Sequence, residues 1–185
     1  RIGSDQCTPG QTAEIARRLG LDVIRPERFV SDNGIVISST KIRNSLQAGE
    51  IEEADSMLGY QYQLYGVVVS GNRLGHTIGF PTANMQLYEP LKLIPGNGVY
   101  LVKVETLGRV YDGMCNIGVR PTLGSGNALT VETNIFDFNE DIYGLDIRIS
   151  FVSKIRNEVK FNDFTVLASQ LEKDRAHCRI LLQEK

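Results

Sequence analysis

The feature that most limits how this chain can fold is a change of hydrophobic period near Tyr60. From there on, apolar and polar residues alternate in short runs, which is the pattern of strands with one buried face. Leu107-Gly108 and the turn-rich run Asn139 to Gly144 are predicted connections between such strands. Because no helical pattern interrupts the runs, they predict an antiparallel barrel or sandwich. The predicted strands are Tyr62 to Ser70, Val99 to Glu105, Arg109 to Ile117, Leu129 to Phe136 and Leu145 to Ser153.

One amphipathic segment, Asn162 to Leu182, follows the predicted strands. Its apolar residues recur at helical spacing, so we expect a C-terminal helix with one face on the core. The positions expected to face the core are Phe164, Leu167, Leu171 and Ile180.

The first 59 residues carry a different pattern. Helices are predicted over Thr8 to Leu19, from the capping hydroxyls of Ser38-Ser39-Thr40 to Ala48, and over Glu50 to Leu58. A glycine follows each of them, as is common at helix C-termini. Leu21 to Ile24 and Ile35 to Ile37 are short strand candidates. Strands alternating with helices predict an α/β layer, although a stretch this short cannot bury a two-sided sheet alone.

The composition narrows the class of partners. The chain has 185 residues, of which 42% are hydrophobic and 23% are charged, as in an ordinary soluble globular protein. Its formal net charge of −2 shows none of the basic excess of a nucleic-acid binder, so nucleic acid is not expected as the main partner. The apolar runs are too short to span a bilayer, and no signal-peptide pattern is present, so we expect a cytoplasmic protein without a membrane partner. The first residue is Arg1 rather than Met, so we expect the natural N-terminus to be missing.

The cysteines and histidines give no metal-binding pattern. Cys7, Cys115 and Cys178 are odd in number and far apart, which predicts reduced thiols. The two histidines, His76 and His177, do not cluster with them, so a zinc site is not expected.

Three glycines, Gly71, Gly75 and Gly79, stand at four-residue intervals after the first predicted strand. Their spacing matches neither a Walker A loop nor a dinucleotide-binding fingerprint. Taken alone, the glycines indicate a flexible connection.

The residues after the glycines favour a phosphate site. Pro81 fixes its own φ and gives the loop a rigid exit. Thr82 and Asn84 then place two neutral oxygen donors close together in an extended segment, which suits Mg²⁺ when nucleotide phosphates supply further ligands. A glycine loop over phosphates beside such a pair is a phosphoryl-transfer arrangement. The alternative is that Thr82 and Asn84 only stabilise a turn.

A candidate base lies on the fourth predicted strand, Leu129 to Phe136. Alternation places Val131, Thr133 and Ile135 on one face and Glu132 with Asn134 on the other. Glutamate is depleted in strands, and a single carboxylate held beside an alcohol is the arrangement of a general base. A solvent-facing glutamate on an open barrel face is the alternative.

Four motifs in order, GNRLGHTIGFPTAN, NIGVRPT, TVETNIFDF and DIYG, resemble those of riboflavin kinase, over Tyr60 to about Leu182. The earlier ISSTKIR, Ile37 to Arg43, resembles a nucleotidyltransferase signature. In this order the segments resemble the bacterial bifunctional family that phosphorylates riboflavin and then adenylylates FMN. The resemblance implies a mainly β fold: a six-stranded antiparallel Greek-key barrel with a C-terminal helix, preceded by an incomplete Rossmann-like α/β segment. It also implies two domains, an adenylyltransferase remnant over 1–59 and a riboflavin kinase domain over 60–185.

The resemblance implies roles for single residues. Thr82 would bind the Mg²⁺ that accompanies ATP, with Asn84 beside it, and the Gly71 to Gly79 loop would close over the nucleotide. Glu132 would take the proton of the ribityl 5′-hydroxyl, giving FMN and ADP. The C-terminal helix and the loop around Arg120 would help to enclose flavin and nucleotide.

Asp174 and Arg175 are further candidates on the C-terminal helix, for which an exposed salt-bridge pair is the favoured interpretation. Ser39, Thr40 and Arg43 would form the triphosphate-binding surface of the adenylyltransferase part.

The sequence departs from the family pattern at two places. No HxGH-type motif is present in the first 59 residues, so negligible FAD synthesis is expected from this chain. His76 stands where many relatives have a basic residue in the glycine loop. Two other classes remain open: a non-catalytic flavin- or nucleotide-binding barrel, and an oligonucleotide-binding barrel, which the lack of basic residues around Tyr60, Tyr62 and Tyr65 disfavours.

Overall fold

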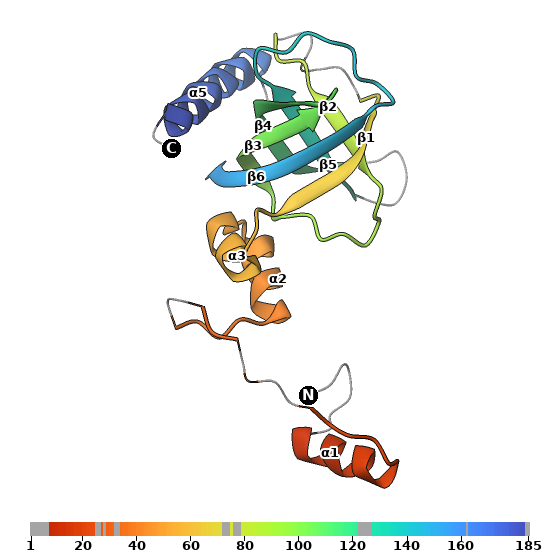
Figure 1. The fold of residues 1–185 in the computed structure, drawn as a ribbon. Helices are drawn as coiled ribbons and strands as arrows, with labels where there is room; N and C mark the ends of the chain where they lie inside the picture. The colour runs from red at the N-terminus through yellow and green to blue at the C-terminus, as the bar shows by residue number, and fades with distance from the viewer. Residues whose placement is uncertain are drawn as a thin grey trace. The chain divides into compact units, whose positions relative to one another are not determined.

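A computed structural model of the chain describes residues 8–24, 27, 29–31, 34–71, 75, 79–121, 127–161 and 163–183 (Figure 1). The chain divides into two compact units, Arg1–Ile37 and Ser38–Lys185. None of the described helices is long and apolar enough to cross a membrane.

The first unit contains helix α1 (Pro9–Arg18). A capping box starts the helix, because the Thr8 amide donates to Gln11 Oε1 at 2.7 Å while the Thr8 hydroxyl accepts from the Gln11 amide. The predicted strand over Leu21 to Ile24 is wrong, since these residues form no ladder. Of the second strand candidate, Val36 alone pairs, in an isolated bridge to Val30. A strand needs a neighbour for its backbone hydrogen bonds, and the described part of this unit supplies only that one bridge.

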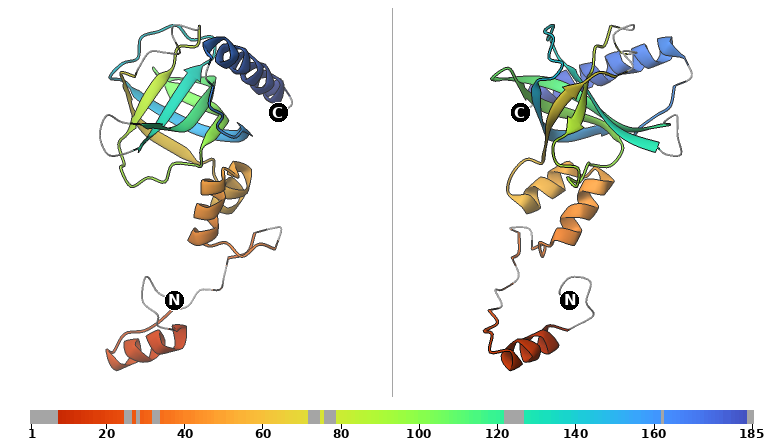
Figure 2. Two further views of the ribbon diagram at one scale, coloured as in Figure 1. Left: turned by 180° about the vertical axis from the view of Figure 1, so that it is seen from behind. Right: turned by 90° about the vertical axis from the view of Figure 1, so that its right-hand side faces the viewer.

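The second unit is built on a closed six-stranded antiparallel barrel with the strand order β1-β2-β5-β4-β3-β6 (Figures 1 and 2). The implied barrel is therefore confirmed. Its strands are β1 (Gln63–Val69), β2 (Ala83–Leu87), β3 (Gly98–Thr106), β4 (Arg109–Pro121), β5 (Asn127–Ile135) and β6 (Asp146–Arg156). The alternation pattern predicts all of them except β2, whose five residues are too few to show a clear period.

The predicted hairpin between β3 and β4 is also confirmed. Thr106 pairs with Arg109, and the two residues between them, Leu107 and Gly108, have φ angles of 51° and 70°. Positive φ at both central positions is the geometry of a type I′ turn, whose twist matches that of the flanking strands.

Helices α2 (Ser39–Ala48) and α3 (Ile51–Leu58) extend the apolar core of the barrel. Leu46, Ile51 and Ala54 are buried in one cluster with the residues that fill the barrel interior. Gly49 and Gly59 end the two helices with φ angles of 79° and 76°, as the sequence predicts. The helix pair and the barrel therefore share a core.

Two hydrogen bonds to backbone carbonyls fix the end of α2 to the rest of the unit. The Gly96 amide donates to the Leu46 carbonyl at 2.9 Å, and Lys154 Nζ donates to the Ala48 carbonyl at 3.2 Å. A Cβ at Gly96 would lie 2.1 Å from the Gln47 carbonyl oxygen, so this close approach requires glycine.

The C-terminal helix α5 (Phe164–Gln183) packs on the outside of β4 and β6 (Figure 2). Two of its four predicted core positions are wrong, because Phe164 is 59% exposed and Ile180 is 54% exposed. The buried residues are Asp174 and Cys178, and Leu171 packs beside them. Asp174, which the sequence pattern predicts to be exposed, therefore lies on the face of the helix that packs against the barrel.

Candidate active site

Two glycines between β1 and β2 lie against the residues predicted to bind metal. Val69 pairs with Asn84, and a Cβ at Gly71 would lie 2.2 Å from Asn84 Nδ2. A Cβ at Gly75 would lie 2.2 Å from the Phe80 carbonyl oxygen and 3.4 Å from Thr82 Oγ1. Two glycines therefore let the backbone approach this corner closely.

The rest of the glycine loop is only partly described. Gly79 has a φ of 80°, a conformation that favours glycine. Residues 72–74 and 76–78, including His76, lie outside the described residues, so the expectation about charge at His76 has no structural test.

The start of β2 lies against the strand that carries the candidate base. Ala83 pairs with Thr133, and Asn84 pairs with Glu132. Ala83 and Thr133 are buried inside the barrel, so their neighbours Asn84 and Glu132 lie on the outer face. Paired residues of an antiparallel ladder have side chains about 5 Å apart at Cβ. The ladder therefore brings the predicted base next to the predicted metal ligand.

The predicted alternation along β5 is confirmed. Val131, Thr133 and Ile135 are buried in the interior, whereas Glu132 is partly exposed on the opposite face. Glu132 is flanked on this outer face by its two cross-strand partners, Asn84 of β2 and Asn116 of β4.

Asn134 is a site residue that sequence reasoning missed. Its Nδ2 donates to the Pro81 carbonyl at 2.7 Å, and the side chain is only 7% exposed. This bond ties the Pro81–Thr82 corner to β5, two residues beyond Glu132. The sequence signal for this residue is that Asn134 carries an amide on the same strand face as Glu132, the candidate base.

A cavity of about 290 Å³ opens beside this corner. It lies where β1 and β5 end and β2 begins. Its floor contains Thr133 Oγ1, a buried hydroxyl without a hydrogen-bond partner in the described part of the chain. The cross-strand neighbour of Thr133 is Cys115, a weak partner at best, and burial raises the pKa of that thiol to about 12. The lining residues are Val68, Pro81, Thr82, Ala83, Thr133, Ile135, Phe138, Asn139, Glu140, Asp141, Ile142 and Tyr143.

Helix α5 touches the same corner. The Arg175 guanidinium lies 5.0 Å from the centroid of the Phe80 ring, which immediately precedes Pro81. Arg179 bonds Asp137, just beyond β5, at 2.9 Å. The expectation that the C-terminal helix lies near the site is consistent with both contacts. Of the loop around Arg120, the Arg120 side chain and residues 122–126 lie outside the described residues.

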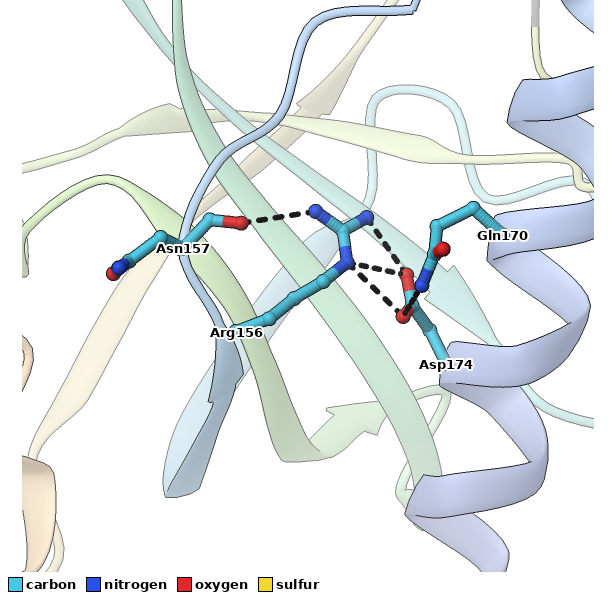
Figure 3. Close-up of polar contacts among 4 residues, drawn as sticks. All are labelled: Arg156, Asn157, Gln170 and Asp174. Carbon is cyan, nitrogen blue, oxygen red and sulfur yellow. Dashed lines mark hydrogen bonds and ion pairs between the residues drawn. The ribbon is translucent and has the colours of Figure 1, made fainter.

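The prediction of an exposed Asp174–Arg175 pair is wrong (Figure 3). Asp174 is 3% exposed and bonds Arg156, the last residue of β6, through Nε at 3.0 Å and Nη2 at 2.7 Å. Gln170 Nε2 donates to the same carboxylate at 2.8 Å. Arg175 pairs instead with Glu172 at 2.6 Å. A buried carboxylate needs hydrogen-bond partners of this kind. Because Arg156 comes from a strand, the pattern of the helix alone does not predict that Asp174 is buried.

Ser39, Thr40 and Arg43 form a separate group on the first turns of α2. All three are exposed, and Arg43 Nη2 donates to Ser39 Oγ at 3.3 Å. The preceding Ser38 caps the helix by accepting from the Lys41 amide at 3.3 Å.

The donor set at the β2–β5 corner fits Mg²⁺. A threonine hydroxyl, an asparagine amide oxygen and the Glu132 carboxylate are hard oxygen ligands, and Asn84 and Glu132 are cross-strand partners. Among the described residues, no group of three or more His, Cys, Asp or Glu side chains could hold a metal ion. A metal at this corner would therefore depend on few protein ligands and on the phosphates of a bound nucleotide.

A barrel with a glycine loop, a neutral oxygen pair and a carboxylate on adjacent strands defines a candidate phosphoryl-transfer site. A family model described as riboflavin kinase matches residues 58–182. The chain therefore belongs to the riboflavin kinase family.

The relatives that match are longer proteins. The bifunctional riboflavin kinase/FMN adenylyltransferase of Bacillus subtilis is 45% identical over 141 residues, which cover 75% of this chain and 44% of the relative. The protein of the same description from Listeria monocytogenes is 40% identical over 174 residues, 92% of this chain and 54% of the relative. The chain thus spans about half the length of the curated relatives it matches.

A solved structure from Streptococcus pneumoniae, described as a macrolide-efflux protein, superposes with a TM-score of 0.77 at 36% identity. The match covers 96% of this chain and 57% of that one. The fold described above is therefore shared with a solved protein over almost the whole chain.

Proposed function

We propose that this chain transfers the terminal phosphoryl group of ATP to the 5′-hydroxyl of riboflavin, giving FMN and ADP. The observation that supports the proposal is the pairing of Asn84 with Glu132, because a carboxylate then lies beside a residue that we assign to a metal–nucleotide site. Phosphoryl transfer requires mainly positioning and electrostatic stabilisation, and a rigid ladder between β2 and β5 supplies the positioning.

Each group at the corner has a defined part in the reaction. Glu132 accepts the proton of the ribityl hydroxyl while the oxygen of that hydroxyl bonds to the γ-phosphorus of ATP. The bond between the γ-phosphorus and the β–γ bridging oxygen breaks, which releases ADP. Thr82 and Asn84 would hold Mg²⁺, which would neutralise phosphate charge when bound. The glycine loop from Gly71 to Gly79 closes over the phosphates and excludes water. Asn134 keeps Thr82 at a fixed position relative to Glu132 through its bond to Pro81.

The cavity beside the corner supports a bound nucleotide or flavin. Its lining combines apolar residues, among them Val68, Ala83 and Ile135, with the polar residues Asn139, Glu140 and Asp141. A cavity with both apolar walls and polar groups is the usual form of a small-molecule site.

Incubation of the chain with riboflavin, ATP and Mg²⁺, followed by chromatography of the flavins, tests the proposal. FMN and ADP should form in equal amounts. Tight riboflavin binding without any FMN would leave only a flavin-binding barrel and overturn the kinase assignment.

The adenylyltransferase assignment of residues 1–59 rests on ISSTKIR and on the names of the relatives. Exposed hydroxyls of Ser39 and Thr40 at the start of α2, with Arg43 one turn on, suit phosphate oxygens. We expect negligible FAD from this chain, since the first 59 residues lack an HxGH-type motif. Appreciable FAD in the same chromatogram would contradict this part of the proposal.

A further inference from the structure

Helix α5 packs on the barrel through a second apolar cluster, separate from the one that fills the interior. Cys178 of α5 is fully buried in this cluster, together with Phe80 and Phe136. Phe80 stands two residues before Thr82, and Phe136 directly follows β5, the strand that carries Glu132. One apolar cluster therefore joins α5 to the segments that carry the predicted metal ligand and the predicted base.

Phe80 links this helix to the glycine loop as well as to Thr82. Its ring is buried and lies 5.0 Å from the Arg175 guanidinium of α5. Its backbone amide donates to the Gly75 carbonyl at 2.8 Å. A shift of Phe80 would therefore move the backbone of the glycine loop together with that of the Pro81–Thr82 corner.

A buried ion pair determines where α5 docks (Figure 3). Two nitrogens of the Arg156 guanidinium, at the end of β6, donate to the Asp174 carboxylate, and Gln170 of the same helix donates to it as well. The guanidinium is itself held by the Asn157 carbonyl, which accepts from its third nitrogen at 3.0 Å. A carboxylate bound in this way is confined in both distance and direction, so the pair fixes the position of α5 along β6. Arg175, which contacts Phe80, is the next residue of the helix.

We propose that Asp174 is a positioning residue for phosphoryl transfer, because its ion pair with Arg156 docks α5 where the helix holds Phe80 in place. The inference rests on the proposed function and adds a residue that acts on that site through another side chain. Apolar contacts are not directional, so the apolar cluster alone leaves the position of the helix less defined than a buried ion pair does. The part of the site that depends on Asp174 is the nucleotide side, since Phe80 is joined to the glycine loop and to the Pro81–Thr82 corner.

Asp174→Asn tests this role, because it keeps the shape of the side chain and leaves the Arg156 charge without its counter-ion. In assays of FMN formation, kcat/KM for ATP should fall about tenfold, since small misplacements of the groups around the phosphates slow the transfer. Riboflavin affinity, measured by flavin fluorescence without nucleotide, should stay at the wild-type value. Gln170→Ala removes one bond to the same carboxylate and should cause the same selective loss at about threefold. If Asp174→Asn does not fold, Gln170→Ala gives the test.

Two double variants separate docking of the helix from other roles of the carboxylate. In Arg156→Met/Asp174→Leu an apolar pair replaces the ion pair, an exchange that buried pairs often tolerate, so most of the wild-type kcat/KM for ATP should return. In a Phe80→Leu background, Asp174→Asn should add little further loss, because both changes act on one contact. A defect that persists in the first double variant, or full additivity in the second, would overturn the positioning role.

Glu105→Gln is the matched control, since it breaks an exposed ion pair with Arg148 and should leave kcat/KM for ATP unchanged. Thermal unfolding shows whether each variant is folded at the assay temperature. Equal weakening of ATP use and riboflavin binding, or no loss in folded Asp174→Asn, would also overturn the positioning role. A wild-type chain that forms no FMN would overturn the proposed function itself, and the positioning role with it.

Discussion

The two ends of strand β1 show how differently one barrel can use its residues. At Tyr62, just before β1 begins, the barrel interior is filled by aromatic and aliphatic side chains and continued by α2 and α3 (Figure 1). The Tyr100 and Phe151 rings pack edge to face at 5.3 Å, and Ile51 is fully buried. This closed end therefore contributes mainly stability.

At Val69, where β1 finishes, the same barrel is loosely built. The chain there has glycines that approach Asn84 and Thr82, a cavity, and the unsatisfied hydroxyl of Thr133. Such features cost stability, because an unpaired buried polar group and an unfilled space both forgo favourable contacts. The apolar closed end thus offsets the stability that is lost at the open end, where we propose that the substrates bind.

Glu132→Gln should have the largest effect, and it should be confined to the open end. Loss of a general base lowers turnover by roughly 10²- to 10⁴-fold, while the melting temperature should stay near that of the wild type. Steady-state FMN formation and thermal unfolding measure the two quantities. A variant that keeps more than half of the wild-type rate would remove Glu132 from the chemistry.

Ile51→Ala should do the reverse at the closed end. The buried side chain leaves a cavity in the shared core of α3 and the barrel, which costs about 2–5 kcal/mol of unfolding free energy. Urea unfolding measures this loss. Turnover per folded molecule should be unchanged, and a lower turnover in fully folded protein would show that the two ends are coupled.

Asn134→Asp should produce an intermediate effect. The substitution keeps the shape but replaces the donor that bonds Pro81 with an acceptor, so the corner that holds Thr82 shifts relative to Glu132. We expect a loss of about tenfold in kcat, in line with the loss of one buried hydrogen bond. The apparent Mg²⁺ affinity should weaken as well, while riboflavin affinity is retained. Asn134→His can restore the donor and should recover part of the activity, which a general loss of folding would not allow.

Substitution of Asp146, on the outer surface, should have the smallest effect. It should leave the residues at both ends of β1 unchanged. Hydrogen bonds from the Tyr88 and Tyr65 hydroxyls, at 2.5 and 2.9 Å, lower the pKa of this carboxyl. A pKa lowered by folding adds stability that is present above the unfolded pKa and is lost as the pH falls through the folded value. Asp146→Asn should therefore flatten the acid side of the stability profile, measured by urea unfolding between about pH 3 and pH 7. An unchanged acid slope would show that the two phenols contribute nothing there.

How much the sequence predicts differs between these regions for physical reasons. The strands and the alternation of Val131, Glu132 and Thr133 follow from period two, which depends only on local geometry. The assignment of Thr82 and Asn84 as metal ligands follows from donor chemistry that is visible in the residues themselves, and it stays a prediction.

The elements that depend on distant partners could not be predicted. Asp174 is buried because Arg156 comes from another element, and no local pattern reports that pairing. Likewise, Leu21 to Ile24 is apolar enough for a strand but has no partner strand among the described residues. The bond from Asn134 to Pro81 depends on which strands become neighbours, and that is a property of the closed barrel.

A single-turnover measurement tests the central claim most directly. Enzyme in excess over riboflavin is mixed with ATP and Mg²⁺, and FMN is followed over time in the wild type and in Glu132→Gln, whose riboflavin affinity is measured separately. We predict rapid FMN formation in the wild type and a chemical step slower by at least 10²-fold in the variant, with riboflavin affinity unchanged. Wild-type FMN formation in Glu132→Gln would contradict the assignment of this carboxylate as the base beside the metal-binding corner.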